Sequence, residues 1–173
     1  MKKILTLAKG LKWELSFIAL VAIVTLTFFL KFSVILVDGN SMYPTFKDGE
    51  YLLITKSSLK DNQIVVFDHP ESWDSKKSKF IKRVVATEGD YIEIDNNTLK
   101  VNEKKEIDIS KKNCELSSSE TFKIPKDKIL VMGDNTANSN DSITQFCEMN
   151  DEFLVDKSDI LVSGESKVIY KKQ

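Results

Sequence analysis

A long uncharged segment near the N-terminus constrains this chain more than any other feature of its sequence. Residues 15–30 (LSFIALVAIVTLTFFL) carry no charge, and beyond Lys31 a second apolar run, FSVILV, reaches residue 37. As a helix, residues 15–30 would be about 24 Å long and residues 15–37 about 34 Å. These lengths bracket the bilayer core of roughly 30 Å. We therefore expect a membrane anchor over residues 13–37, with Trp13 at one interface and Lys31 snorkelling to the other.

The residues that flank this segment predict its orientation. Residues 1–12 contain four lysines, and the positive-inside rule places such a basic N-terminus in the cytoplasm. Residues 38–173 are then expected outside the cell membrane, as one extracytoplasmic domain. The lysines are Lys2, Lys3, Lys9 and Lys12.

Two other interpretations of the apolar segment are less favoured. A cleaved signal peptide has a shorter apolar region followed by a small-x-small cleavage site, and here the apolar run leads directly into Asp38-Gly39-Asn40. A buried core helix would have a polar face. Within residues 15–30 the only hydroxyl residues are Ser16, Thr25 and Thr27.

After residue 37 the apolar residues recur in short runs rich in β-branched and aromatic side chains. Clusters of Asp, Asn and Gly separate these runs, a pattern typical of a mainly β domain with antiparallel sheet or barrel-like architecture. Residues 91–101 (YIEIDNNTLKV) predict a hairpin, and the polar residues 102–123 predict a loop. The expected strands are residues 51–54, 64–67, 80–85, 91–94, 99–101, 129–132 and 160–162.

Charge and motif content exclude several function classes. The formal net charge of −1 offers no electrostatic footprint for nucleic acid. No phosphate-binding glycine loop occurs, and we expect no cofactor. The single histidine, His69, lies beside a proline in a charged loop, where a solvated side chain is the expected outcome. A zinc site would need His69, Cys114 and Cys147 together, and these residues lack the close spacing of zinc ligands. No metal is therefore expected.

A serine with a lysine base remains as a hydrolytic possibility. A serine hydroxyl is a weak nucleophile until a neighbour removes its proton, and lysine can do so only when burial lowers its pKa. Ser41 follows Asp38-Gly39-Asn40, and Lys82 lies within an apolar run, residues 80–85. From these residues alone, Lys82 could equally be an edge-strand charge that opposes aggregation.

Four sequence blocks, in order behind the apolar segment, resemble the bacterial type I signal peptidases, also called leader peptidases. Their motifs are close to G-x-S-M-x-P-T-L, G-D-I-V-V-F, Y-I-K-R-V-I-G-x-P-G-D and G-D-N-x-x-x-S-x-D-S-R. The corresponding segments here are GNSMYPTF (residues 39–46), NQIVVF (62–67), FIKRVVATEGD (80–90) and GDNTANSNDSI (133–143). The resemblance extends from about residue 10 to about residue 165, as in the short Gram-positive-like forms with one anchor.

The resemblance implies a role for each matching residue. Ser41 would be the nucleophile, with its backbone N–H stabilising the oxyanion, and Lys82 the general base. Some members carry a hydroxyl at the place of Gly39, which this chain lacks. Ser139 would orient the lysine amine by a hydrogen bond. Gly133, Asp134 and Asp141 would hold the shape of the site. The substrate would be an exported preprotein with small residues at positions −1 and −3, bound as an added strand.

The sequence departs from the family pattern at several positions. Asn62-Gln63 replaces Gly-Asp, and Ala86 and Glu88 replace Gly and Pro. The largest departure is Ile143, where the family has an arginine that pairs with the acid found here at Asp141. We expect Arg83, the neighbour of Lys82, to pair with Asp141 instead.

Two further functions, one covalent feature and the position of Trp73 stay open. A paralogue acting as an assembly factor or chaperone for secreted or pilus-type proteins would show little cleavage. A self-cleaving, repressor-like Ser-Lys protein would be soluble, which the apolar segment disfavours. Cys114 and Cys147 could form a disulfide outside the cell or remain two buried thiols. Trp73 could contact the bilayer interface or pack on its own domain.

Overall fold

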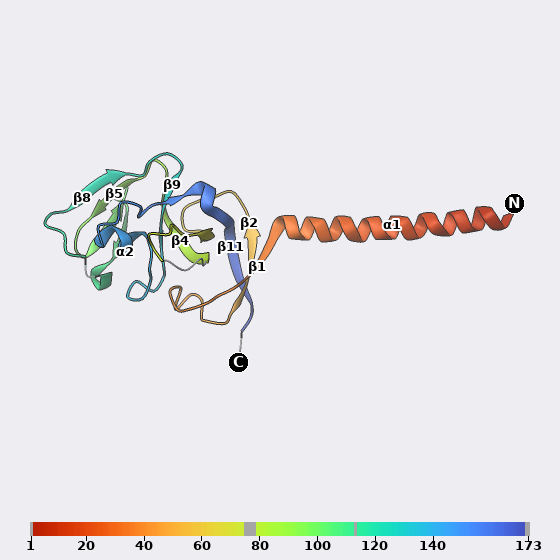
Figure 1. Cartoon of the computed structure of the whole chain (residues 1–173), viewed down its shortest axis with the longest axis horizontal. Helices are drawn as coiled ribbons and strands as arrows, with labels where there is room; N and C mark the ends of the chain where they lie inside the picture. Colours follow the sequence, from red (N-terminus) through yellow and green to blue (C-terminus); the bar gives the residue numbers. More distant parts are fainter. Residues whose placement is uncertain (1, 75–78, 113, 172–173) are drawn as a thin grey trace.

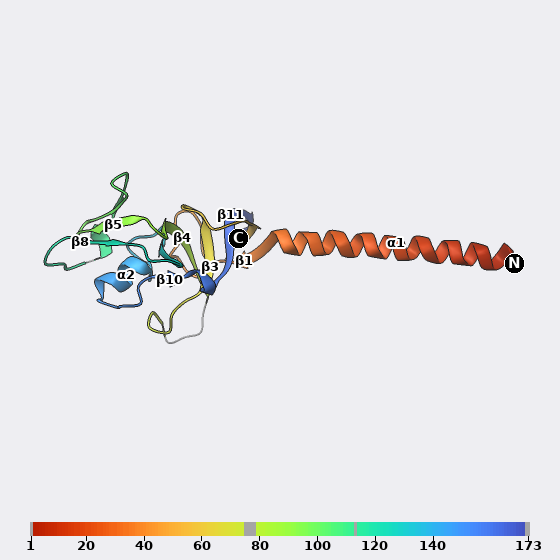
Figure 2. The ribbon, with the colours of Figure 1, turned by 90° about the horizontal axis from the view of Figure 1, so that it is seen from above.

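A single long helix precedes the β domain. The computed structural model describes residues 2–74, 79–112 and 114–171, and side chains from Trp13 onward; the side chains of the four N-terminal lysines lie outside this description. Helix α1 (Lys2–Lys31) projects away from the domain in both views (Figures 1 and 2). Its segment Trp13–Lys31 has a mean hydropathy of 2.1 and no buried residue. Residues 13–31 therefore form an apolar helix of about 29 Å that contacts little of the rest of the protein.

The helix ends earlier than the expected anchor. Residues 32–36 form strand β1 (Phe32–Leu36), which pairs antiparallel with β2 (Tyr51–Lys56). The expectation of an anchor extending to residue 37 is therefore wrong for this second apolar run. Periodicity does not distinguish a short apolar strand from a helix, and here pairing with β2 favours the strand. At the junction, Lys56 Nζ donates to Phe29 O at 2.9 Å and satisfies a carbonyl at the end of α1.

Two antiparallel sheets make up the domain, as expected for a mainly β chain. The seven-stranded sheet has the order β1-β2-β11-β3-β4-β9-β10, and the four-stranded sheet the order β7-β6-β5-β8. Among the described residues neither sheet closes on itself, so the architecture is open and no closed barrel forms. The remaining strands are β3 (Ile64–Asp68), β4 (Lys79–Thr87), β5 (Tyr91–Ile94), β6 (Thr98–Val101), β7 (Lys105–Asp108), β8 (Glu120–Lys123), β9 (Lys128–Met132), β10 (Val155–Asp156) and β11 (Ile160–Tyr170).

The seven expected strands and the hairpin are confirmed. β5 and β6 pair antiparallel, with Ile92 opposite Val101. The expectation of a loop over residues 102–123 is wrong in part. This segment contains β7, the 3₁₀ helix η1 (Ser110–Lys112) and β8. β7 and β8 are four residues long and contain one apolar residue each, Ile107 and Phe122, which is too few to give a clear periodic signal. A second 3₁₀ helix is η2 (Lys157–Asp159), and a short helix is α2 (Ser142–Cys147).

The core joins the two sheets and fixes the turn after β1. Buried residues of β5 and β6 pack against β9 and against Ile143 of α2. Near the start of the domain, Met42 and Phe46 are buried against β2 and β3. Because both follow Ser41 closely in the chain, their burial anchors the turn that carries this serine.

A disulfide joins Cys114 to Cys147, 33 residues apart. Of the two alternatives for these cysteines, a disulfide or two buried thiols, the disulfide is therefore correct. It links the segment after η1 to the last residue of α2. In both views this end of the domain, with α2, β5 and β8, lies far from α1 (Figures 1 and 2).

Candidate active site

Ser41 and Lys82 meet in the folded chain. Lys82 Nζ lies 2.9 Å from Ser41 Oγ, within hydrogen-bonding distance. The two residues are 41 positions apart, one on the turn after β1 and the other on β4. The turn begins at Gly39, whose φ of +83° is a conformation that glycine adopts at little cost. Its N–H donates to Asp48 Oδ1 at 2.8 Å.

Lys82 has the environment that lowers a lysine pKa. It is 3% exposed, and its amine lies 4.9 Å from the centroid of the Phe80 ring. Burial lowers the pKa of Lys82 from 10.5 to about 8; Asp141 opposes this shift, and Lys112 adds to it. A substantial fraction of the amine is therefore neutral near pH 8 and able to accept the proton of Ser41.

The segment after β9 holds the Ser41 turn through its backbone. Asn135 N–H donates to Ser41 O at 2.9 Å, and Asn135 Nδ2 donates to Asn40 O at 3.0 Å. A Cβ atom on Gly133 would collide with the Ser139 side chain and with Ser41 O. Only glycine therefore permits this close approach between the β9 end and the Ser41 turn.

The structure does not contain the expected hydrogen bond from Ser139 to Lys82. Ser139 Oγ is buried against the Gly133 backbone and has no hydrogen-bond partner among the described residues. Ser139 instead contributes its backbone carbonyl, which accepts from Lys112 Nζ at 2.8 Å. The resemblance identified the correct neighbourhood, but the hydroxyl makes no hydrogen bond to the amine.

The expected pairing of Arg83 with Asp141 is wrong. Arg83 Nε and Nη2 donate to the two carboxylate oxygens of Asp134, at 2.8 and 2.7 Å. This bidentate contact raises the pKa of Arg83. Consecutive side chains of a strand point to opposite faces, so Lys82 and Arg83 face different environments. Arg83 therefore binds Asp134 on the face of β4 opposite to Lys82.

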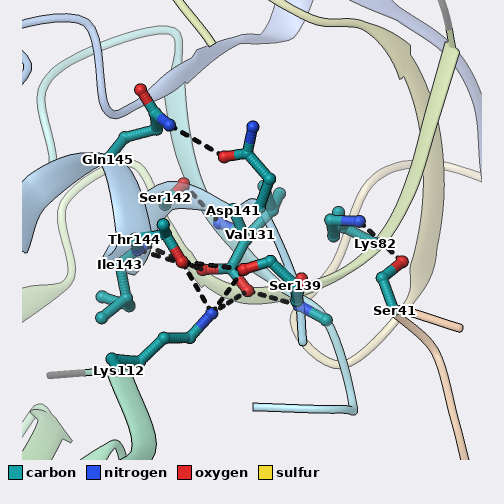
Figure 3. Close-up of polar contacts among 12 residues, drawn as sticks. Ser41, Lys82, Lys112, Val131, Ser139, Asp141, Ser142, Ile143, Thr144 and Gln145 are labelled. Carbon is teal, nitrogen blue, oxygen red and sulfur yellow. Dashed lines mark hydrogen bonds and ion pairs between the residues drawn. The ribbon is translucent and has the colours of Figure 1, made fainter. Parts of the chain in front are cut away.

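Asp141 is paired with Lys112, which sequence reasoning missed. Lys112 Nζ lies 2.8 Å from Asp141 Oδ2, and both side chains are almost fully buried. Figure 3 shows Ser139 and Asp141 between Lys112 on one side and the Lys82–Ser41 pair on the other. Lys112 lies in η1, in the segment expected as a loop, and no motif in the sequence singles it out.

A cleft of about 470 Å³ opens beside the Ser41–Lys82 pair. Its walls come from β1, the Ser41 turn, the start of β4 and the segment before Asp141. β9 pairs with β4 only from Arg83 onward, so Lys79 to Lys82 have a strand partner, β3, on one side alone. β1 lies at the edge of its sheet. Two strand edges therefore border the cleft and can hydrogen-bond an extended peptide.

His69 and Trp73 do not line this cleft. His69 Nδ1 lies 2.7 Å from Pro70 O, and its ring packs against Phe80, so it is packed rather than simply solvated. Trp73 is 5% exposed, and its Nε1 donates to Glu152 O at 2.7 Å. Trp73 thus packs within its own domain, and the suggested contact with the bilayer interface is wrong.

The chain is similar to a known protein family and to several individual proteins. The profile of the family described as "Signal peptidase, peptidase S26" matches residues 10–163. The chain is 34% identical to signal peptidase I of Bacillus amyloliquefaciens, covering 76% of this chain and 74% of that relative. It is 33% identical to signal peptidase I T of Bacillus subtilis (strain 168), with the same coverage of each chain. It is 30% identical to signal peptidase I of Bacillus licheniformis, covering 92% and 87%.

Among solved structures, a signal peptidase I from Enterococcus faecalis V583 superposes with a TM-score of 0.43. The sequence identity is 17%, and the match covers 62% of this chain and 97% of that chain.

Proposed function

The chain belongs to the signal peptidase family S26, and from this premise we propose that it cleaves signal peptides from exported preproteins with Ser41 as nucleophile and Lys82 as base. The observation that carries the mechanism is the 2.9 Å contact between the Ser41 hydroxyl and a buried lysine amine. No histidine is needed, since a neutral amine can accept the serine proton.

The reaction follows from this contact. Neutral Lys82 takes the proton of Ser41 as Oγ attacks the scissile carbonyl, and the ammonium then protonates the leaving amine. The same amine, neutral again, takes a proton from the water that attacks the acyl-enzyme and returns it to Ser41 Oγ as the acyl–oxygen bond breaks. The backbone N–H of Ser41 donates to the oxyanion. Gly39 brings no hydroxyl for a second donor, and open space surrounds the position where its Cβ would be.

The two strand edges beside the cleft support binding of the substrate as an extended segment. An extended peptide between β1 and the start of β4 presents its scissile carbonyl to Ser41. Alternate residues of such a segment point the same way, so positions −1 and −3 face the same cleft wall. Ile35, Val66 and Ile81 contribute apolar surface to this wall. A preference for small residues at −1 and −3 is the proposal that the family resemblance adds.

The surface around the end of α1 supports a membrane location. Five exposed apolar residues of β1, β2 and β11 form what we call the apolar rim: Val34, Leu36, Tyr51, Ile169 and Tyr170. Leu36, Tyr51 and Tyr170 are register partners across the three strands, and Figure 1 shows these strands next to α1. Together with the apolar helix, this rim suits the surface of a bilayer.

We therefore propose that residues 13–31 span the cell membrane and that the β domain lies outside it, beginning at β1. The basic residues 1–12 remain in the cytoplasm under the positive-inside rule. In this arrangement the cleft lies on the domain that is tethered to the membrane from which signal peptides emerge.

Cleavage of a purified preprotein in detergent tests the proposed function. The full chain should release the mature protein, and Ser41→Ala and Lys82→Met should each abolish the product at matched concentration. Ser58→Ala and Lys123→Met are matched controls on exposed positions away from the cleft, and both should cleave like the wild type. A correctly folded wild type that releases no mature protein would favour the assembly-factor alternative. Full cleavage by either dyad variant would overturn the mechanism.

A further inference from the structure

A buried ion pair lies behind the proposed dyad. The Lys112 and Asp141 side chains are 3% and 0% exposed, and their charged atoms are 2.8 Å apart. Lys112 Nζ contacts three acceptors at 2.8 Å: Asp141 Oδ2, Ser139 O and Thr144 Oγ1. An ammonium has three donor hydrogens, so each has a partner. Buried charges in proteins are tolerated when they are paired and fully hydrogen-bonded in this way.

Asp141 connects this pair to the catalytic turn. Its Oδ2 also accepts from Gly133 N–H at 3.0 Å, and its Oδ1 accepts from Ile143 N–H and Thr144 N–H at 3.2 Å, which caps α2. Gly133 packs directly beneath Ser41 O. Hydrogen bonds and packing thus run from Lys112 through Asp141 and Gly133 to the backbone of the nucleophile.

The segment that carries Lys112 is held in place independently. Lys112 N–H donates to Ile109 O at 2.8 Å, and Ile109 N–H donates to Asn97 O at 2.7 Å. Two residues after Lys112, Cys114 is bonded to Cys147 of α2, the helix that Asp141 caps. The ion pair and the disulfide therefore join the same two segments.

The identity of residue 143 explains why the cation comes from another element. Ile143 is fully buried in the core between α2, β5 and β9. A charged side chain at this position would replace core packing, and the family's arginine is absent here. Lys112 lies in η1, 31 positions before Ile143 in the chain, and brings a positive charge to the Asp141 carboxylate.

We propose that Lys112 is a positioning residue for the Ser41–Lys82 dyad, holding the Asp141 carboxylate in the hydrogen-bonded arrangement that fixes Gly133 beneath Ser41. This inference rests on the proposed peptidase function for its catalytic consequence. Its structural and electrostatic consequences are measurable without cleavage.

The two charges of the pair act on Lys82 in opposite directions. Asp141 raises the pKa of Lys82 and Lys112 lowers it. The other cation of the cleft, Lys79, is an exposed residue paired with Asp68 at 3.0 Å, and Arg83 is paired with Asp134. In Lys112→Met, Asp141 keeps its three backbone N–H donors, from Gly133, Ile143 and Thr144. The pKa of Lys82 should then move upward, because the nearby cation that lowers it has been removed.

The experiment compares Lys112→Met with Lys112→Arg and with Lys111→Met, an exposed lysine of the same 3₁₀ helix. The Lys82 titration is followed by NMR of ¹³C-labelled lysine, with the resonance assigned through Lys82→Arg. Peptide cleavage gives kcat/KM against pH, and thermal unfolding gives Tm. Lys112→Met should raise the pKa of Lys82, move the acidic limb of kcat/KM upward and lower its plateau about 10- to 100-fold. Lys112→Arg should stay within a few-fold of wild type, and Lys111→Met should match it.

Distinct outcomes separate the two proposals. A Lys112→Met protein with a lower Tm but an unchanged Lys82 titration and plateau would show a purely structural lysine and overturn the inference. A wild type without cleavage, whose Lys82 titration still responds to Lys112→Met, would overturn the peptidase function and leave the positioning role standing. If Lys112→Met fails to fold, Thr144→Val removes one acceptor of Lys112. That variant leaves the Lys112 charge in place and removes one contact that holds it, so the plateau of kcat/KM should fall by a smaller factor than expected for Lys112→Met, and an unchanged plateau would overturn the inference.

Discussion

At the scale of single residues, the proposed mechanism depends on the protonation state of Lys82. Its pKa of about 8 predicts an acidic limb in kcat/KM near pH 8, because only the neutral amine accepts the serine proton. Activity should fall about tenfold for each pH unit below that value. A pH–rate profile with a soluble peptide checks this. A limb near 10.5, the ordinary lysine pKa, would place the amine in solvent and contradict the base assignment.

The same pKa has a consequence for stability, which provides a control on the kinetic limb. Because the folded-state pKa lies below the unfolded value of 10.5, the unfolded chain binds more protons between pH 8 and 10.5. The contribution of Lys82 to the free energy of unfolding therefore rises with pH across this window and is constant below it. Urea unfolding of wild type against Lys82→Met should show this difference. Equal pH dependence in both proteins would show that the kinetic limb belongs to another group.

Arg83 illustrates how far a sequence can mislead about a partner. It adjoins Lys82 in the chain, and proximity in sequence suggested proximity to Asp141. Strand geometry sends Arg83 to the other face, where Asp134 accepts two of its hydrogen bonds. The cation for Asp141 instead comes from Lys112. The alternation of strand side chains, which a motif does not encode, decides between these pairings.

At the scale of elements, the disulfide should stabilise the part of the domain that supports the site. In the chain-entropy account, closing a loop of 33 residues contributes about 4 kcal/mol. Cys114→Ser/Cys147→Ser should lower the free energy of unfolding by about this amount and reduce cleavage, because the Lys112 segment loses its link to α2. Denaturant unfolding and peptide cleavage measure the two effects.

A reducing agent supplies the matched control for this prediction. It should lower the stability of wild type toward that of the double variant and leave the double variant unchanged. Wild-type stability that is insensitive to both the substitutions and the reductant would contradict a structural role for the bridge.

At the scale of the whole molecule, the boundary between helix and domain predicts the result of truncation. Removing residues 1–31 takes away only α1 and should leave a folded domain. Removing residues 1–37 also deletes β1 and the buried Val37, and should cost about 3 kcal/mol or more. Thermal unfolding of the two truncated chains checks this. Equal stability would show that β1 is dispensable to the sheet.

Cleavage by the shorter truncation tests the role of the helix. Without residues 1–31, cleavage of a soluble peptide should stay within a few-fold of the full chain, whereas cleavage of a membrane-inserted preprotein should fall much further. The helix holds Ser41 near the membrane and raises its effective concentration toward the substrate. Equal losses on both substrates would contradict a tethering role.

The sequence by itself determined the features that local patterns encode. An uncharged run long enough for a membrane helix, short β-branched runs separated by turn residues and four ordered motifs led to the helix, the principal strands and the Ser41–Lys82 pair. Each of these depends on periodicity or on residue types at fixed spacing. The physical cause, burial of apolar surface at a given repeat, is visible without coordinates.

Only the tertiary structure decided what depends on long-range pairing. Residues 32–36 form a strand because β2 offers them an edge, and Asp141 is paired with Lys112 from a distant segment while Ile143 lies in the core. The Ser139 rotamer, the Arg83–Asp134 contact and the Cys114–Cys147 bridge likewise depend on which segments meet. Such contacts are set by the packing of the whole chain, since the free energy of burying a charge depends on the partner that folding brings to it.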